Sequence, residues 1–125
     1  ALDDLPCDLA ARFLQPIPDP SAPCYRVRED VRYRVLFSRY DVSGEASLPP
    51  GAPFDLVAFR NVAIYFRREV HEDVFARVAS ALRPGGYLCL GEAEWPPASL
   101  ERHLYCAVRQ LRLFRGGCAV GAEAA

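Results

Sequence analysis

The chain has 125 residues, of which 51% are hydrophobic and 25% charged, and its formal net charge is −1. This length fits one domain or part of one, and the composition is sufficient for a packed core. The arginines are scattered among acidic residues, so charge gives no basis for non-specific binding of nucleic acid. No apolar run approaches the roughly 18 residues that a membrane span needs, so we expect no membrane insertion.

Cysteine usage indicates a reducing compartment. The five cysteines include no C-x-x-C pair, and the two histidines lie at no metal-ligand spacing from them. We therefore expect neither a disulfide framework nor a metal site. Acidic residues near the first residue are not typical of a signal peptide, and we expect a cytoplasmic protein.

The start of the chain predicts a short helix over about residues 6–14, because Leu5, Leu9 and Phe13 recur every four residues. Residues 15–24 contain four prolines, which exclude a regular helix or a central strand. We expect a loop there, in a position that also suits the tip of a hairpin.

Two apolar segments follow this loop. Residues 25–27 suit a short strand. Residues 31–38 carry apolar side chains at alternate positions, which predicts a strand that ends near Asp41. Gly, Pro and Ser dominate residues 44–53, which we expect to form a second loop.

The middle of the chain has the pattern of a strand, a helix and a second strand. The apolar run at residues 54–59 ends in Arg60 and Asn61, and a helical pattern covers about residues 67–82. A Pro-Gly-Gly sequence then ends the predicted helix before a second apolar run at residues 87–91. This is a βαβ unit of an open parallel sheet, in which ligands bind beyond the carboxyl ends of the strands.

The rest of the chain predicts one more helix and one more strand. Two prolines after the second apolar run open the helix, with Leu100, Leu104 and Val108 on its inward face. Alternating residues at 111–114 predict the last strand.

Residues 54–66, with the sequence FDLVAFRNVAIYF, resemble the F-D-hydrophobic-R-N-V-x-I-Y-F signature of CheR-type chemoreceptor methyltransferases. Residues 82–94, LRPGGYLCLGEAE, are similar to the family's LrPGGyLflGhsE element, and weaker blocks at residues 5–14 and 25–42 occur in the family's order. The L-x-P-G-G element alone is common among class I methyltransferases. The R-N-V-x-I-Y-F string, in order with the other blocks, is specific.

The resemblance implies an α/β fold: the second part of a Rossmann-like class I methyltransferase sheet, mostly parallel with an antiparallel final strand and helices on its faces. The family's strand order is 3-2-1-4-5-7-6. Residues 1–125 then form a partial S-adenosylmethionine-dependent methyltransferase domain that lacks the first two strands and the glycine-rich loop. We expect residues 31–38 to make no ladder with residues 54–59. We also expect the chain alone to be inactive and to bind cofactor weakly. The missing N-terminal part of the fold is an expected pairing partner for this chain.

The implied function is an S-adenosylmethionine-dependent protein-glutamate O-methyltransferase that acts on chemoreceptor glutamates in bacterial chemosensory signalling. Its partners would be the cytoplasmic helices of methyl-accepting chemoreceptors. Two alternatives remain open. The missing glycine loop favours a non-catalytic methyltransferase-like module for binding or scaffolding, and the weaker match at residues 92–94 allows a class I methyltransferase with another acceptor.

Methylation of a carboxylate needs alignment and exclusion of water more than it needs reactive side chains. The family places Arg60 and Tyr65 near the reactive methyl group, so the resemblance implies that these two residues are catalytic. On the alternative reading, Arg60 pairs with Asp55 or Glu94, and Tyr65 packs in the core.

The resemblance also implies a set of cofactor-binding residues. Asp41 and Val42 would contact the adenine, while Asn61 and Val62 follow the strand that ends at the methyl group. Asp41 and Asn61 are equally suited to ordinary turns.

Two further residues of the acidic loop are open to interpretation. We expect Glu94 to be a solvated loop acid, with a role beside Arg60 as the alternative. Trp95 could close over a substrate or pack as a peripheral core aromatic.

Overall fold

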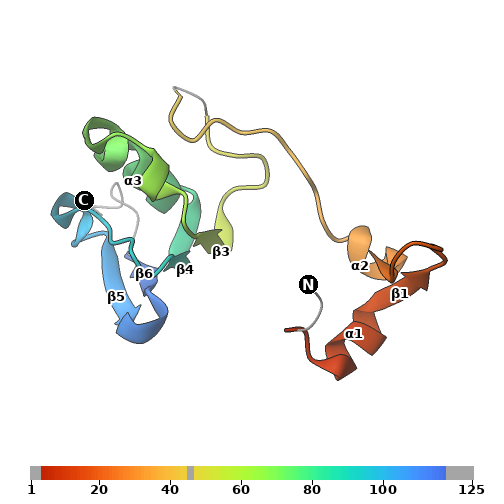
Figure 1. The fold of residues 1–125 in the computed structure, drawn as a ribbon. Helices are drawn as coiled ribbons and strands as arrows, with labels where there is room; N and C mark the ends of the chain where they lie inside the picture. The colour runs from red at the N-terminus through yellow and green to blue at the C-terminus, as the bar shows by residue number, and fades with distance from the viewer. Residues whose placement is uncertain (1–3, 45–46, 118–125) are drawn as a thin grey trace. The chain divides into compact units, whose positions relative to one another are not determined.

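The computed structural model describes residues 4–44 and 47–117 (Figure 1). The chain divides into two compact units, Ala1–Ser38 and Arg39–Ala125, which are described separately. Over the described residues, no helix is both long and apolar enough to cross a membrane.

The first unit is a small helix and hairpin. Helix α1 (Cys7–Phe13) leads into strand β1 (Leu14–Ile17), which pairs antiparallel with strand β2 (Cys24–Val27). The helix predicted at residues 6–14 and the short strand predicted at residues 25–27 are confirmed. The predicted loop is shorter than expected, because residues 14–17 pair with the returning strand and only the hairpin tip remains irregular.

The predicted strand at residues 31–38 is wrong. A single helical turn, α2 (Glu29–Arg32), occupies its start, and the residues after it form no regular structure. Two acidic residues in the first turn favour a helix N-terminus there. The alternating apolar side chains have no surface to cover: Tyr33, Leu36 and Phe37 are each more than four-fifths exposed. A strand also needs a neighbour for its backbone groups, and the described residues supply none.

The second unit contains a four-stranded sheet with the order β3-β4-β6-β5. The strands are β3 (Phe54–Phe59), β4 (Leu82–Leu90), β5 (Leu104–Val108) and β6 (Leu113–Gly116). Strands β3 and β4 are parallel, and β6 is antiparallel to both of its neighbours. This order corresponds to the fourth, fifth, seventh and sixth strands of the expected sheet, so the predicted fold class is confirmed. In the described chain, β3 pairs with β4 alone.

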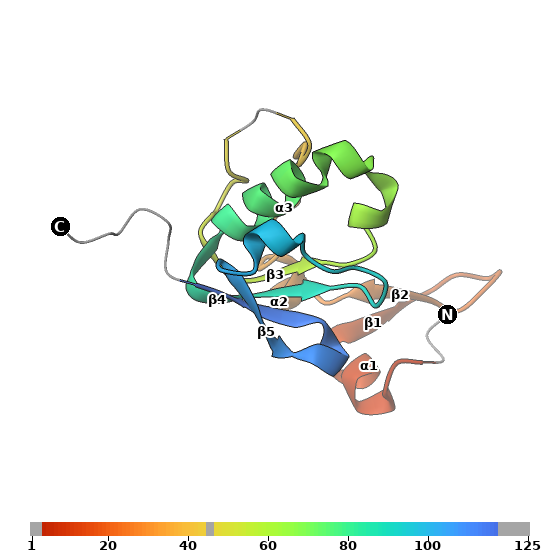
Figure 2. The same ribbon diagram turned by 90° about the vertical axis from the view of Figure 1, so that its left-hand side faces the viewer.

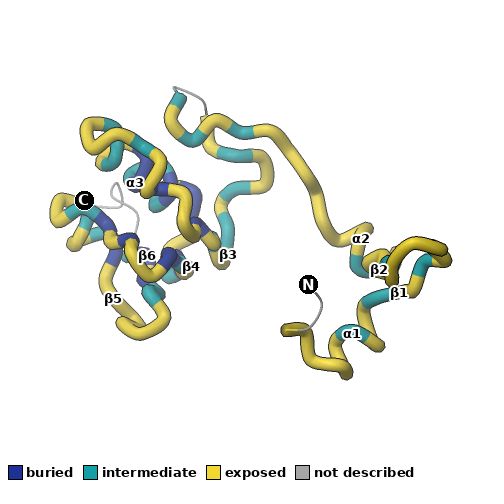
Figure 3. Tube along the Cα trace, in the orientation of Figure 1, coloured by how far each residue is buried: buried dark blue, intermediate teal, exposed yellow. Residues whose placement is uncertain are grey.

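Helix α3 (His71–Ser80) packs across this sheet, as Figure 2 shows, and a 3₁₀ turn at Arg68–Val70 precedes it. It buries Val74, Phe75 and Val78 against strand residues that are also buried, and the rings of Phe59 and Phe75 meet edge to face at 6.0 Å. Figure 3 shows the buried residues gathered along α3 and the strands beneath it. The predicted helix is confirmed with shorter ends.

The Pro-Gly-Gly sequence lies inside β4 instead of before it. Leu82 already pairs with Phe54, and the register shifts before Leu56 pairs with Tyr87. Gly85 has a positive φ of 78°, which favours glycine. A Cβ on Gly86 would lie 3.0 Å from the backbone oxygens of both Arg83 and Phe54. The two glycines therefore form a bulge that brings β4 against β3.

The helix predicted after the two prolines is wrong. Only a 3₁₀ turn, Ala98–Leu100, forms, and β5 follows at Leu104. The apolar residues of this segment fit a helical spacing, but the segment forms a strand because β6 pairs with it. Leu104 pairs with Gly116 at the buried end of this ladder. A 3₁₀ turn at Arg109–Leu111 then leads into β6, which confirms the last strand at a slightly later position.

Replacement of Gly86 tests whether this bulge needs a glycine. Gly86→Ala should lower the free energy of unfolding by about 1 to 3 kcal/mol, because the added methyl group meets backbone oxygens that cannot move aside. Gly116→Ala is the matched control, since its nearest neighbours lie at an ordinary 3.6 Å. Urea denaturation measures both. Equal stability of the two variants would show that the bulge tolerates a side chain.

Candidate functional site at the carboxyl edge of the sheet

Three loops meet at one edge of the sheet. Strands β3, β4 and β5 run in the same direction, so Arg60, Gly91 and Arg109, which follow them, lie at the same edge. Parallel sheets bind ligands at this carboxyl edge. The site predicted from sequence therefore lies where the topology favours one.

The carboxylate of Glu94 joins the loops after β3 and β4. One oxygen accepts the backbone N–H groups of Asn61 and Gly91, each at 2.8 Å. The other accepts those of Val62 at 2.8 Å and Ala63 at 2.7 Å. Glu94 is only 4% exposed. These four charge-assisted hydrogen bonds fix the loop that carries the signature residues.

The local sequence is suited to this contact. Asn61 has a left-handed backbone with a φ of 57°, a conformation that asparagine tolerates better than most residues, and it directs successive N–H groups toward one point. Gly91 lies so close that a Cβ there would stand 2.2 Å from the Asn61 side-chain oxygen and 2.9 Å from its nitrogen. Glycine is therefore required for the two loops to meet.

The prediction of a solvated Glu94 is wrong, because its carboxylate is buried among backbone donors. Burial acts to raise the pKa of Glu94, but the backbone N–H groups of the two loops outweigh it and hold the pKa below the ordinary value of 4.5. Nothing in the sequence distinguishes Glu94 from Glu92 two residues earlier, which is exposed. Only the folded loops separate their roles.

The structure excludes the structural alternatives for Arg60 and Tyr65. Asp55 pairs with Arg83 at 2.8 Å, and Glu94 is occupied by backbone groups, so neither acid holds Arg60. Tyr65 is 82% exposed and does not pack in the core. It ends the 3₁₀ turn Ala63–Tyr65, whose first residue is buried. Both side chains therefore extend from an anchored loop into solvent.

Asp41 and Val42 lie on a separate segment beside α3. One oxygen of Asp41 accepts the Ser43 N–H at 2.9 Å, the Ser43 hydroxyl at 2.7 Å and the Gly44 N–H at 3.1 Å. The Ser43 hydroxyl is the largest cause that lowers the pKa of Asp41. Val42 packs against the core, and its carbonyl accepts the Arg77 guanidinium. Asp41 thus forms the turn that its sequence allows, with its second oxygen unbonded in the described chain.

The Trp95 ring contacts a core residue, and two arginine side chains lie over the ring. This ring meets the buried Phe114 edge to face at 4.9 Å and is 40% exposed, which supports the packing alternative. The guanidinium carbons of Arg109 and Arg112 lie 5.3 Å and 4.9 Å from the ring centroid. Neither arginine was predicted to lie at a site, because the sequence pattern assigned their positions to a helix end and a strand.

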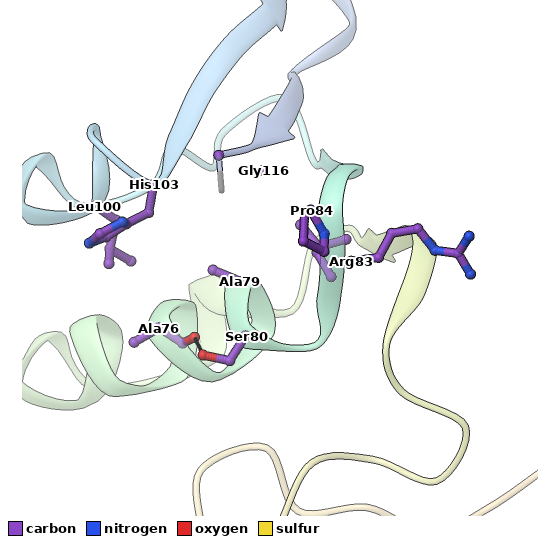
Figure 4. A pocket seen from close by; sticks show the side chains of 10 residues that line it. Ala76, Ala79, Ser80, Arg83, Pro84, Leu100, His103 and Gly116 are labelled. Atoms are coloured by element: carbon purple, nitrogen blue, oxygen red, sulfur yellow. Dashed lines mark hydrogen bonds between the residues drawn. The ribbon is translucent and has the colours of Figure 1, made fainter. Parts of the chain in front are cut away.

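A pocket of about 490 Å³ lies at the amino edge of the sheet, and Figure 4 shows the side chains that line it. The end of α3, the start of β4, His103 and Gly116 line it. None of the predicted catalytic or cofactor-binding residues lines this pocket.

Comparison with known proteins identifies the family. The model described as CheR methyltransferase, SAM binding domain, matches residues 1–111. The chain belongs to this family. The match includes the loop of Arg60 to Tyr65 and its anchor Glu94, and the cofactor of the family is S-adenosylmethionine.

Two of the similar proteins are named chemotaxis protein methyltransferases. The chain is 41% identical over 88 residues to the chemotaxis protein methyltransferase Cher2 of Pseudomonas putida, covering 69% of this chain and 31% of that protein. It is 49% identical over 69 residues to the chemotaxis protein methyltransferase of Vibrio anguillarum, covering 55% of this chain and 24% of that protein. An uncharacterized 104.1 kDa protein of Rhodobacter capsulatus is 35% identical over 92 residues, which cover 74% of this chain and 9% of that protein. The chain spans less than a third of the length of each of these relatives.

Removal of the Glu94 charge tests the anchor. Glu94→Gln should lower the free energy of unfolding by about 1 to 3 kcal/mol at pH 7, because four N–H groups lose a charged acceptor. The pKa of the folded state is lowered, so this stabilisation is complete above the unfolded pKa and disappears as pH falls through the folded value. Urea denaturation of wild type and variant across this range should therefore converge in acid.

Glu92→Gln is the control, since it removes an exposed carboxylate from the same loop. It should change stability little at any pH. A difference between wild type and Glu94→Gln that stays constant from pH 7 into acid would contradict the charge-based anchor.

Proposed function

We propose that the chain is part of an S-adenosylmethionine-dependent protein-glutamate O-methyltransferase that acts on chemoreceptor glutamates in bacterial chemosensory signalling. The observation that carries this proposal is the anchored loop of Arg60 to Tyr65. Glu94 holds its backbone, and the arginine and tyrosine side chains remain exposed at the carboxyl edge. The family assignment and the names of the relatives support the same activity.

The two exposed side chains match what this reaction needs. A glutamate carboxylate is already nucleophilic, so the protein has to hold it in line and keep water away. The Arg60 guanidinium can bind the acceptor carboxylate in a fixed orientation through paired N–H groups. The Tyr65 hydroxyl can donate a hydrogen bond to the same group or orient its neighbour. Neither role requires a change in protonation.

The predicted cofactor-binding residues fit the family's cofactor in part: Asn61 and Val62 lie at this edge, and Asp41 and Val42 lie on the segment beside α3. When bound, S-adenosylmethionine supplies an electrophilic methyl group. The backbone N–H groups of Asn61 and Val62 are already bonded to Glu94, so these residues would contact the cofactor through their side chains and carbonyls. The second carboxylate oxygen of Asp41 can accept an adenine amine, with Val42 against the ring.

The wider assignments are part of the same proposal. The partners are the cytoplasmic helices of methyl-accepting chemoreceptors, and the protein acts in the cytoplasm. Residues 1–125 are part of a methyltransferase domain, and further strands of that domain pair with the edge of β3 that has no neighbour in the described residues. The glycine-rich loop is not in this sequence, so the isolated chain should bind S-adenosylmethionine weakly.

Substitutions of the two exposed residues test the activity. Arg60→Ala should lower methyl transfer about a hundredfold and Tyr65→Phe about tenfold, because orientation of the acceptor is lost. S-adenosylhomocysteine binding should stay nearly unchanged in both. The assay follows radiolabelled methyl ester formation on receptor protein by the complete gene product.

Arg68→Ala and Tyr105→Phe are matched controls, since both residues are exposed and lie outside the anchored loop. They should retain wild-type rates. Wild-type rates in Arg60→Ala and Tyr65→Phe would overturn their assigned roles. A complete gene product that binds no S-adenosylhomocysteine would favour a non-catalytic module, and a methylated product other than a glutamate ester would favour another acceptor.

A further inference from the structure

Beside the anchored loop lies a cluster of one tryptophan and two arginines. The Arg112 and Arg109 guanidinium carbons lie 4.9 Å and 5.3 Å from the centroid of the Trp95 ring. The ring itself is fixed by its edge-to-face contact with the buried Phe114. Cation–π contacts of this kind hold guanidinium groups in place without neutralising their charge. We call Trp95, Arg109 and Arg112 the Trp95 cluster.

The Trp95 cluster is a neighbour of Arg60 across the sheet. Phe59, which precedes Arg60, pairs with Leu90 in the adjacent strand. The N–H of Leu90 donates to the carbonyl of Arg112 at 3.0 Å. Two strand spacings therefore separate the backbones that carry the two arginines, a distance of about 10 Å. Both lie at the carboxyl edge.

The cations of the cluster are available for a partner. In the described part of the chain, neither Arg109 nor Arg112 forms an ion pair with a carboxylate. The Arg112 side chain donates to the carbonyl of Glu92 at 3.0 Å, which leaves its remaining N–H groups free to bind. Arg109, Arg112 and Gln110 line an open depression beside Glu92. Glu92 thus lines the same depression as the two guanidinium groups, but in the described residues it forms no ion pair with either of them.

We propose that the Trp95 cluster is a docking site for acidic residues of the protein segment that carries the acceptor glutamate. This inference rests on the proposed function for its choice of substrate. With Arg60 on the acceptor carboxylate, the cluster lies about 10 Å along the edge. A helix covers that distance in about two turns. Arg109 and Arg112 would therefore bind carboxylates that flank the acceptor and would set specificity for an acidic substrate.

Charge favours a protein partner over a nucleic acid. The chain as a whole carries a net charge of −1, and no basic stripe extends along it. Nucleic-acid binding proteins neutralise many phosphates along a track. Two guanidinium groups fixed on one ring match a short acidic element instead, since arginine binds a carboxylate through paired N–H groups.

The chain provides its own probe, because Trp95 is its only tryptophan. The 125-residue protein is titrated with a helical peptide that contains glutamates two turns apart and no tryptophan or tyrosine. Trp95 fluorescence should change to saturation. The variant Arg109→Gln/Arg112→Gln should bind about tenfold more weakly, as expected for the loss of two exposed ion pairs. Arg109→Gln alone should weaken binding about threefold and leaves the bond from Arg112 to Glu92 in place.

The matched control is Arg102→Gln/Arg115→Gln, which removes the same charge from exposed residues away from this edge. It should bind as the wild type does. The docking site is overturned if the peptide gives no saturable change, if the control loses as much affinity as the cluster variant, or if a glutamine-for-glutamate peptide or an oligonucleotide binds equally well. This readout needs neither cofactor nor turnover, so a failure of docking is distinct from a failure of methyl transfer.

Discussion

The carboxylate of Glu94 accepts N–H groups from the loops after β3 and β4, and the geometry of the whole carboxyl edge follows from this contact. The left-handed backbone of Asn61 turns three successive N–H groups toward the acid. The absence of a side chain at Gly91 lets the two loops approach. Ala63 is buried as a consequence, and Tyr65 is left on the surface. The signature residues are thus positioned by an acid some thirty residues away in sequence.

A buried carboxylate without a cation is costly unless other groups replace its hydration. Here backbone N–H groups do so, and for this reason the pKa of Glu94 is lowered despite its burial. The arrangement also limits the chemistry of the edge. The N–H groups of residues 61–63 would otherwise form an anion site, but they are fully used inside the protein. A ligand at this edge can therefore contact residues 61–63 only through their side chains and carbonyls.

The sequence was informative where local pattern and topology agree. The apolar periodicity of α3 and the two strands around it predicted the βαβ unit, and the R-N-V-x-I-Y-F string identified the loop that Glu94 anchors. The pattern misled where tertiary contacts decide. Residues 31–38 alternate like a strand but have no neighbour, and residues 104–108 fit a helix but pair with β6. The role of Glu94 could not be predicted, because it depends on two loops that meet only in the fold.

Two consecutive residues organise both parts of the edge. Glu94 fixes the loop of Arg60 and Tyr65, and Trp95 holds the two arginines on the other side of β4. Because Glu94 and Trp95 lie in the same short loop after β4, a change in that loop affects the proposed acceptor site and the proposed docking site together.

Amide hydrogen exchange measured by NMR tests the central contact most directly. The N–H groups of Asn61, Val62, Ala63 and Gly91 should exchange slowly in the wild type, while those of Glu92 and Ala93 in the same loop should exchange fast. In Glu94→Gln these four N–H groups should exchange fast, and amides in the centre of α3 should keep their protection. Fast exchange of the four N–H groups in the wild type, at the rate of Glu92 and Ala93, would contradict an anchored carboxyl edge.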